Sequence, residues 1–240
     1  MIPWTSPPVI RVEGVEIHGF SITCGGRRSG LRGMVLRRAQ RQGIARSEIV
    51  PLYVWMCAAG ALAAAAGYLY LGGMSSLLVA AAGLCAGILC CGCNRYTGAE
   101  SLRLLDTAAF AVPFAAALGR LGCALAHEHP RRLSNTWLAV RYPGGARYDL
   151  GLLDFLFLQA LCVAFIVLDR RSRPGGFFLA TGMAAYSAFR ILRGALEDES
   201  NGVMWAVLFG AGIMLLPIMS IMSTSVHARK KARQDCPARA

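Results

Sequence analysis

The residues whose types and spacing best support chemistry lie in one short polar stretch, residues 119–130, which reads GRLGCALAHEHP. Its candidate residues are Gly119, Arg120, Gly122, His127, Glu128 and His129. An arginine in hydrocarbon costs at least about 3 kcal/mol, so an arginine at membrane depth is a functional candidate by default. The glycines beside it allow close approach of a backbone or a ligand. The alternative is an arginine whose guanidinium reaches back to the membrane surface.

The two histidines of this stretch are predicted to act separately. His127 and His129 are two residues apart, so on a helix their side chains would diverge by about 200° and not share a metal. The zinc-protease pattern HExxH is also absent, because Pro130 and Arg131 follow His129. Either histidine is a candidate general base. We therefore predict no metal site and no cofactor.

A second group of chemically capable residues follows helical spacing: Tyr186, Arg190, Arg193 and Glu197. Offsets of 0, 4, 7 and 11 place a phenol, two guanidiniums and a carboxylate on one narrow stripe of a helix. Arg193 and Glu197 are expected to pair along that helix. Arg120 and Arg190, from separate helices, could instead hold a phosphate through bidentate hydrogen bonds. That arrangement predicts a phospholipid headgroup site.

The composition indicates that these groups lie in a membrane. Of 240 residues, 55% are apolar and only 16% are charged, well below the quarter that is usual in soluble domains. This argues against an ordinary soluble, disordered or fibrous protein. The net charge is +12, and 23 of the 25 basic residues are arginine. Such an excess is compatible with nucleic acid, anionic lipid or the cytoplasmic loops of a membrane protein.

Long apolar runs predict an all-α, polytopic membrane helix bundle with about six spans. The expected spans are residues 51–71, 74–93, 104–126, 150–168, 176–196 and 202–226. Each approaches the roughly 20 residues that cross a bilayer. The alternative for the three that carry isolated charges is a soluble core helix. N-terminal to the first span, the apolar part of residues 15–30 is too short to cross a bilayer and is expected to be re-entrant or interfacial. The predicted divisions are residues 1–50, 51–226 and 227–240.

Loop charges predict the orientation of this bundle. The basic segments 27–48, 94–103, 169–175 and 227–240 are placed in the cytoplasm. Residues 127–149 then lie outside, and the four arginines they carry are an exception to the rule. The arginines near residue 37 are explained as a flank of the first span. No aromatic residues interleave with them, so nucleic acid is not an expected partner.

Two of these motifs resemble the prolipoprotein diacylglyceryl transferase family. The stretch from Gly119 to Pro130 is similar to the family's GRxGN-type signature with a following acidic residue. The run Tyr186-Ser187-Ala188-Phe189-Arg190 is similar to its late Y-x-x-FR helix. Weaker similarities occur in the same order at residues 8–20, at 73–76 and at the Arg-Pro turn of 173–176.

The resemblance implies a bacterial inner (cytoplasmic) membrane protein that is multi-pass and uses phosphatidylglycerol. Its family transfers the diacylglyceryl group of that lipid to the thiol of a lipobox cysteine in a preprolipoprotein. By resemblance, Arg120 and Arg190 would hold the lipid phosphate, and Glu128 stands at the family's acidic position. Tyr186 and Arg193, with Gly119 and Gly122, complete the predicted substrate site. A base must produce the attacking thiolate, and His127 or His129 is the local candidate.

The chain also departs from the family pattern. Cys123 and Ala126 replace two signature asparagines, and Ser76-Leu77-Leu78-Val79 stands where the family has an HGG motif. Gly194 stands where the family has a glutamate. These departures leave open an alternative, a catalytically impaired homologue that binds a phospholipid or a partner without transfer.

Overall fold

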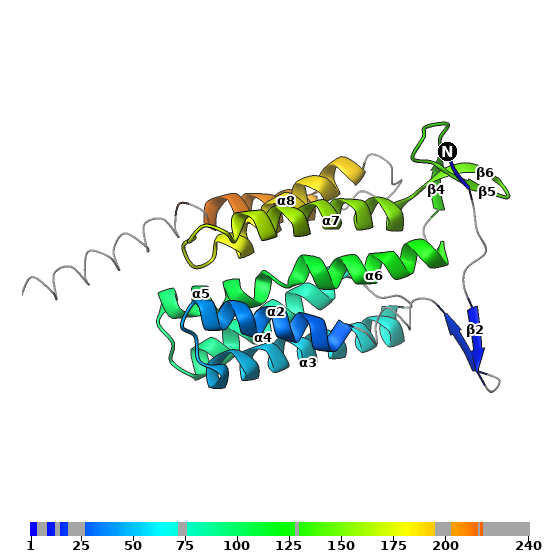
Figure 1. The fold of residues 1–240 in the computed structure, drawn as a ribbon. Coiled ribbons are helices and arrows are strands. Elements are labelled where there is room, and N and C mark those ends of the chain that lie inside the picture. The colour runs from blue at the N-terminus through cyan, green and yellow to red at the C-terminus, as the bar shows by residue number, and fades with distance from the viewer. Residues whose placement is uncertain are drawn as a thin grey trace, which may run out of the picture. The chain divides into compact units, whose positions relative to one another are not determined.

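The computed structural model of the protein describes residues 1–3, 9–12, 15–18, 27–71, 76–127, 130–194, 203–215 and 217. Most of them are helical, as Figure 1 shows, so the predicted helical fold is confirmed at this level. The helices are α2 (Arg27–Arg41), α3 (Arg46–Leu71), α4 (Ser76–Cys93), α5 (Gly98–Ala109), α6 (Val112–Ala126), α7 (Leu150–Leu168) and α8 (Phe177–Gly194). A further apolar helix covers Val203–Leu215.

Three of the described helical segments are long and apolar enough to cross a membrane. They are Arg46–Tyr70, Gly98–Ala126 and Leu150–Leu168. Leu78–Cys93 and Val203–Leu215 are apolar but shorter. Large side chains on α3 face outward, including Leu69 at 74% and Tyr70 at 84% exposure. Exposed apolar surface of this kind is costly in water and ordinary in lipid.

Short strands accompany the helices, which the all-α prediction did not include. They are β1 (Ile2–Pro3), β2 (Val9–Val12), β3 (Val15–His18), β4 (Pro130–Leu133), β5 (Val140–Tyr142) and β6 (Gly145–Asp149). β2 and β3 form an antiparallel pair. The segment predicted to be re-entrant thus begins in β3, while residues 19–26 lie outside the described part. The other four strands form one sheet in the order β1-β5-β6-β4.

The chain divides into two compact units, each described here by itself. Unit 1 comprises residues 1–34, 111–172 and 181–213, and unit 2 comprises 35–110, 173–180 and 214–240. In unit 2, α3 packs along α4, and small residues permit the close approach. A Cβ on Gly87 would lie 2.8 Å from Leu105 Cδ2 and 3.1 Å from Met56 Sδ. α5 begins with a reciprocal capping box between Thr97 and Glu100.

A buried ion pair ties unit 2 together. Arg38 donates to Asp106 at 3.0 Å, and the two side chains are 4% and 1% exposed. The other oxygen of Asp106 accepts the backbone N–H groups of Phe178, at 2.6 Å, and Leu179, at 3.1 Å. The Arg38 guanidinium also lies 4.3 Å from the Phe178 ring centroid and 4.7 Å from that of Phe110. The carboxylate of Asp106 therefore accepts hydrogen bonds from backbone N–H groups in the first turn of α8 and also pairs with the Arg38 guanidinium.

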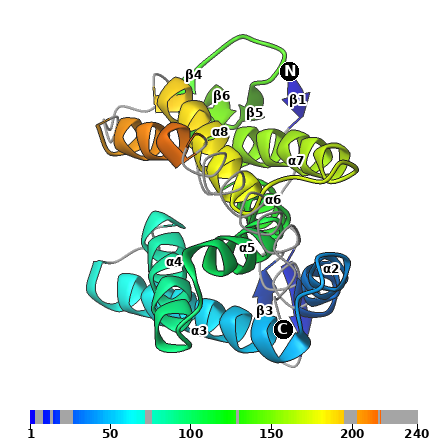
Figure 2. The ribbon, with the colours of Figure 1, turned by 90° about the vertical axis from the view of Figure 1, so that its left-hand side faces the viewer.

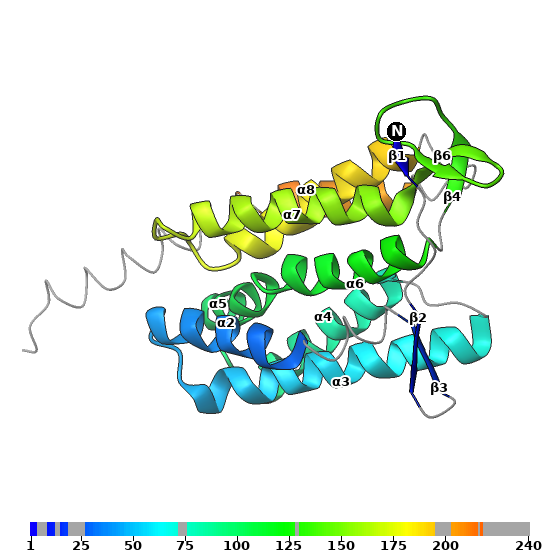
Figure 3. The ribbon, with the colours of Figure 1, turned by 45° about the vertical axis from the view of Figure 1, so that its right-hand side comes forward.

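In unit 1, α6 and α7 form an antiparallel pair whose connection is the strand region β4 to β6 (Figure 3). Asp149 ends β6 and caps α7, because its Oδ1 atom accepts the N–H of Leu152 at 3.1 Å. The core between the helices contains Ala117, Leu158 and Cys162. One end of the α6–α7 pair therefore carries the sheet.

Candidate functional site

The candidate site centres on a buried carboxylate, Asp154 of α7, whose side chain is fully buried. Three arginines surround it. Arg120 of α6 places Nε 2.9 Å from Asp154 Oδ2, and Arg190 of α8 places a terminal nitrogen 3.8 Å from the same oxygen. Arg193 of α8 donates to Asp154 Oδ1 at 2.5 Å. Arg120 and Arg190, which were predicted to hold one phosphate, thus both approach the carboxylate of Asp154 in unit 1, and the phosphate itself stays a prediction.

The arginines around Asp154 are themselves mostly buried. The side chains of Arg120, Arg190 and Arg193 are 18%, 13% and 4% exposed. The contact of Asp154 Oδ2 with Arg120 is an ion pair without hydrogen-bond alignment. The Nε atom of Arg190 makes no hydrogen bond within the described residues. Among those residues the cluster thus has three positive charges and one negative charge.

Aromatic rings form one wall of this arginine cluster. The Arg190 guanidinium lies 4.7 Å from the ring centroid of Trp205, which is 5% exposed. Tyr186 packs edge-on against Trp205 with centroids 5.7 Å apart. Phe157 stacks on Phe189 at 4.1 Å. These rings restrict the arginine side chains and keep water away from them.

Local sequence places the arginine cluster at one end of the helices of unit 1. Arg120 lies near the end of α6, Asp154 in the second turn of α7, and Arg190 in the last turns of α8. α6 and α7 approach closely at Gly151, where a Cβ would lie 3.0 Å from Ala124 N and 3.2 Å from the carbonyl carbon of Cys123. The glycine on α7 thus permits the backbone contact beside which Arg120 meets Asp154.

A second polar group lies at the end of α6, toward the strands. His127 is the C-cap of α6 in a left-handed conformation, with φ of 52°. Its Nδ1 atom lies 3.2 Å from Asp149 Oδ2, and Tyr142 donates to the same oxygen at 2.7 Å. Asp149 is 1% exposed. A buried carboxylate on Nδ1 favours the tautomer that leaves Nε2 as an acceptor, which is the arrangement of a general base.

The same carboxylate affects the phenol of Tyr142. The pKa of Tyr142 is raised above its ordinary value. The largest cause is burial, and the hydrogen bond to Asp149 and the negative charge of Asp149 raise it further. Tyr142 therefore stays a proton donor over the whole neutral range. His127 follows Arg120 by seven residues, which is about 10 Å of rise along the axis of α6.

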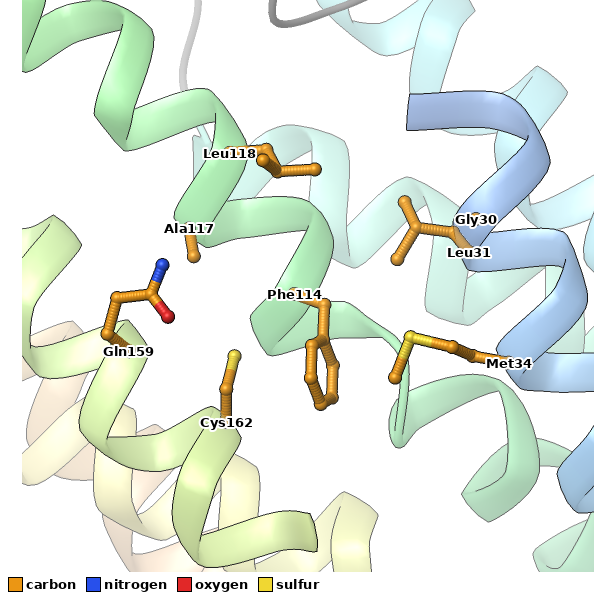
Figure 4. A pocket seen from close by; sticks show the side chains of 8 residues that line it. All are labelled: Gly30, Leu31, Met34, Phe114, Ala117, Leu118, Gln159 and Cys162. Carbon is orange, nitrogen blue, oxygen red and sulfur yellow. The ribbon is translucent and has the colours of Figure 1, made fainter. Parts of the chain in front are cut away.

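An apolar cavity of about 230 Å³ opens beside α6 and α7 in unit 1, as Figure 4 shows. Its lining residues are Gly30, Leu31, Met34, Phe114, Ala117, Leu118, Gln159 and Cys162. Gln159 is the one strongly polar side chain among them. Ala117 precedes Arg120 by about one turn of α6. On the surface of this helix the cavity therefore lies nearer the N-terminus of α6 than the arginine cluster does.

Most of the predicted site residues fall in these two groups. Tyr186, Arg190 and Arg193 share one face of α8, as their spacing predicts. Gly122 is buried within α6. Glu128 and His129 lie outside the described residues, as does Glu197, the expected partner of Arg193. Within the described part, Arg193 pairs with Asp154 instead.

Several residues of the site were not singled out from sequence. Asp154 is the isolated charge of the apolar run 150–168, and the sequence pattern predicts no role for Asp149, Tyr142, Gly151 or Trp205. A carboxylate in an apolar span is the signal that would have indicated Asp154, because such a charge requires a partner. Within the described residues, no group of three or more histidine, cysteine or acidic side chains is arranged to hold a metal ion.

No family model and no curated protein matches this chain. The resemblance to the transferase family therefore rests on the motifs quoted above and stays a prediction. The geometry around Asp154 and His127 is independent of that resemblance.

Proposed function

We propose that this protein binds the phosphate of an anionic phospholipid at the arginine cluster of Arg120, Arg190 and Arg193. The observation that carries the proposal is the convergence of three mostly buried guanidiniums on one carboxylate. Within the described part of the chain, one carboxylate, that of Asp154, lies among these three guanidiniums. A phosphodiester brings a negative charge and oxygen acceptors that match the fork of arginine donors.

The surroundings of the cluster favour a lipid over a free anion. The cavity beside α6 is lined almost entirely by apolar side chains, among them Ala117, which precedes Arg120 by about one helical turn. A hydrocarbon chain fits such a lining, while the phosphate stays at the level of the arginines. Headgroup and chain would then lie along one face of α6.

We propose further that the bound lipid is phosphatidylglycerol and that the reaction is diacylglyceryl transfer to a cysteine thiol of a preprolipoprotein. His127, held by Asp149, takes the thiol proton. The thiolate attacks the glyceryl carbon, and the bond from that carbon to the phosphate oxygen breaks. A thioether forms and glycerol phosphate leaves, with its added negative charge stabilised by Arg120 and Arg190. The proton on His127 then passes to the departing phosphate or to water.

The same proposal places the protein in the bacterial inner membrane with six spans. In this proposal the six spans are the three long apolar segments, the two shorter apolar helices and α8. Residues 127–149 then face the outside. A reporter that is active only outside the cytoplasm should be active when it is fused after residue 145, in the loop between β5 and β6. It should be inactive when it is fused after residue 172. The reverse pattern would contradict this orientation.

The deciding experiment is transfer by the purified full chain in phosphatidylglycerol vesicles. A lipobox peptide should gain the mass of one diacylglyceryl group, and Arg120→Ala or Arg190→Ala should lower the rate by 100-fold or more, about the effect of losing one oxyanion donor. Arg37→Ala, at an exposed position of α2, is the matched control and should keep the wild-type rate. Equal rates in all variants would reject the arginine site.

A second candidate function is lipid binding without transfer. The specific observation that favours it is that all three arginines of the cluster approach Asp154. Cys123 also replaces the signature asparagine next to this cluster. This candidate predicts bound phosphatidylglycerol after purification, and no modified peptide under any condition of the transfer assay.

A further inference from the structure

The strand region between α6 and α7 carries a basic surface that the arginine cluster does not use. Residues 130–149 contain four arginines and one acidic residue. The arginines are Arg131, Arg132, Arg141 and Arg147, of which the first three are exposed. We call these four arginines, with Trp137 and Leu133, the strand surface.

The only acidic side chain of residues 130–149 does not neutralise the strand surface. Asp149 is 1% exposed, and its oxygens are directed to Tyr142, His127 and the first turn of α7. Arg147 does donate to the backbone carbonyl of Arg131 at 3.2 Å, but a carbonyl carries no net charge. All of the exposed net charge in this region is therefore positive.

Large apolar side chains lie among these arginines. Trp137 is 75% exposed and Leu133 is 61% exposed. Trp137 belongs to the connection between β4 and β5, residues 134–139, which Figure 2 shows as a wide arch above β5 and β6. Tryptophan is enriched at the boundary between hydrocarbon and headgroups, where an apolar ring with one polar N–H is best accommodated.

The covalent connections place the strand surface at a membrane face. It follows α6 directly and leads directly into α7, and both helices belong to segments long and apolar enough to cross a bilayer. Side chains of the strands are therefore within a few residues of the level where a helix leaves the hydrocarbon. A connection that extends sideways past the helix ends at this level lies over the neighbouring lipids.

We propose that the strand surface docks on the anionic phospholipid headgroups of the membrane in which the protein is embedded. Basic residues near an anionic leaflet are attracted to it over about one Debye length, and Trp137 and Leu133 add insertion into the interface. This also accounts for four arginines in a loop that the charge rule places outside: their partner is the headgroup layer. The inference rests on the membrane insertion of the proposed function but not on the transfer reaction.

Docking of the strand surface would enrich anionic lipid beside Arg120 and Arg190. Both groups of arginines lie at the end of unit 1 where α6 ends and α7 begins. The strand surface would hold headgroups at the bilayer surface, while the cluster takes a phosphate between the helices. The two sites would therefore share one chemical preference, for a negatively charged phospholipid.

The test uses the full chain in vesicles with brominated acyl chains, which quench tryptophan by contact. The emission of Trp137 is obtained as the difference between the wild type and Trp137→Phe. This emission should be quenched more strongly in phosphatidylglycerol than in phosphatidylcholine, and added salt should remove the difference. The triple variant Arg131→Gln, Arg132→Gln, Arg141→Gln should lose the lipid preference and keep its far-ultraviolet circular dichroism.

A matched triple variant on exposed arginines of unit 2 separates surface charge from position. The variant Arg37→Gln, Arg41→Gln, Arg46→Gln should keep the lipid preference. Arg120→Ala should keep it too, so loss of transfer and loss of docking are distinguishable. Trp137 emission that is equal in both lipids, or unquenched in either, would overturn the proposal. Preferential protection of Trp137 by an acidic soluble protein would overturn it in favour of a protein partner.

Discussion

Nε of Arg120 lies 2.9 Å from Oδ2 of Asp154, between two helices that the chain connects through the strand region. Asp154 is fully buried, so its charge depends on the arginines around it. In a low-dielectric interior, an ion pair offsets its desolvation only when the geometry is good and the remaining polar groups are satisfied. Asp154 therefore both holds the arginine cluster together and sets its residual charge.

Asp154→Asn should destabilise the protein strongly. The variant removes the one negative charge from three buried guanidiniums, and breaking a buried pair in this way costs about 3–5 kcal/mol. The midpoint of thermal unfolding, followed by circular dichroism in a neutral detergent, should fall clearly.

The same variant also tests the phosphate site. If a phospholipid phosphate takes the place of the missing carboxylate, phosphatidylglycerol should raise the midpoint of Asp154→Asn more than that of the wild type. Phosphatidylcholine should not do so to the same extent, since its headgroup has no net charge. An equal response of both proteins to both lipids would argue against phosphate binding at the cluster.

The raised pKa of Tyr142 predicts that the folded protein loses stability at alkaline pH. Its folded pKa is raised by burial and by Asp149, above the value of about 10 in the unfolded chain. The sign follows: the stabilisation is complete below pH of about 10 and is lost as the pH rises through the folded pKa. The wild type should therefore lose stability above that pH more steeply than Tyr142→Phe, measured as the unfolding midpoint against pH.

Phenolate absorbance gives an independent reading, since Tyr142→Phe should remove the tyrosine that ionises late. Identical curves for wild type and Tyr142→Phe would show that the contact with Asp149 does not contribute.

Gly151→Ala should weaken the pairing of α6 and α7. The added Cβ would meet Ala124 N at 3.0 Å and the Cys123 carbonyl carbon at 3.2 Å, both of them backbone atoms that cannot move alone. Overpacking of this kind costs about 1–3 kcal/mol. Gly92→Ala, where a Cβ would meet nothing within 4 Å, should be neutral or slightly stabilising in thermal unfolding.

Asp106→Ala should be among the most destabilising changes in unit 2. It would leave Arg38 buried without its carboxylate and expose the N–H groups of Phe178 and Leu179 as unsatisfied donors. The expected loss is about 3 kcal/mol or more in thermal unfolding. The double variant Arg38→Met, Asp106→Leu should recover part of it, because it removes the buried charge as well. If adding Arg38→Met to Asp106→Ala restored the full stability of the wild type, the capping role of Asp106 would be contradicted.

Some of this site was predictable from local sequence. The apolar runs with isolated charges predict helices at membrane depth, and the spacing of Tyr186, Arg190 and Arg193 predicts one shared face, which α8 has. Arg120 and Arg190 do lie near each other, but at the carboxylate of Asp154, and the predicted phosphate stays untested. Asp154 was not predicted as their common partner, because helical spacing relates residues within a helix and not between helices.

What the sequence by itself determined is the set of elements: apolar segments near bilayer length, three of which carry an isolated arginine or carboxylate. Desolvation makes such charges expensive, so their presence already predicts that partners exist. Only the tertiary structure decided which partners these are. Gly151 permits α6 to approach α7 there, and Asp149 joins the strands to His127. Ion pairs act over a few ångströms, so the packing of helices distant in sequence, and not their composition, chose Asp154 for Arg120.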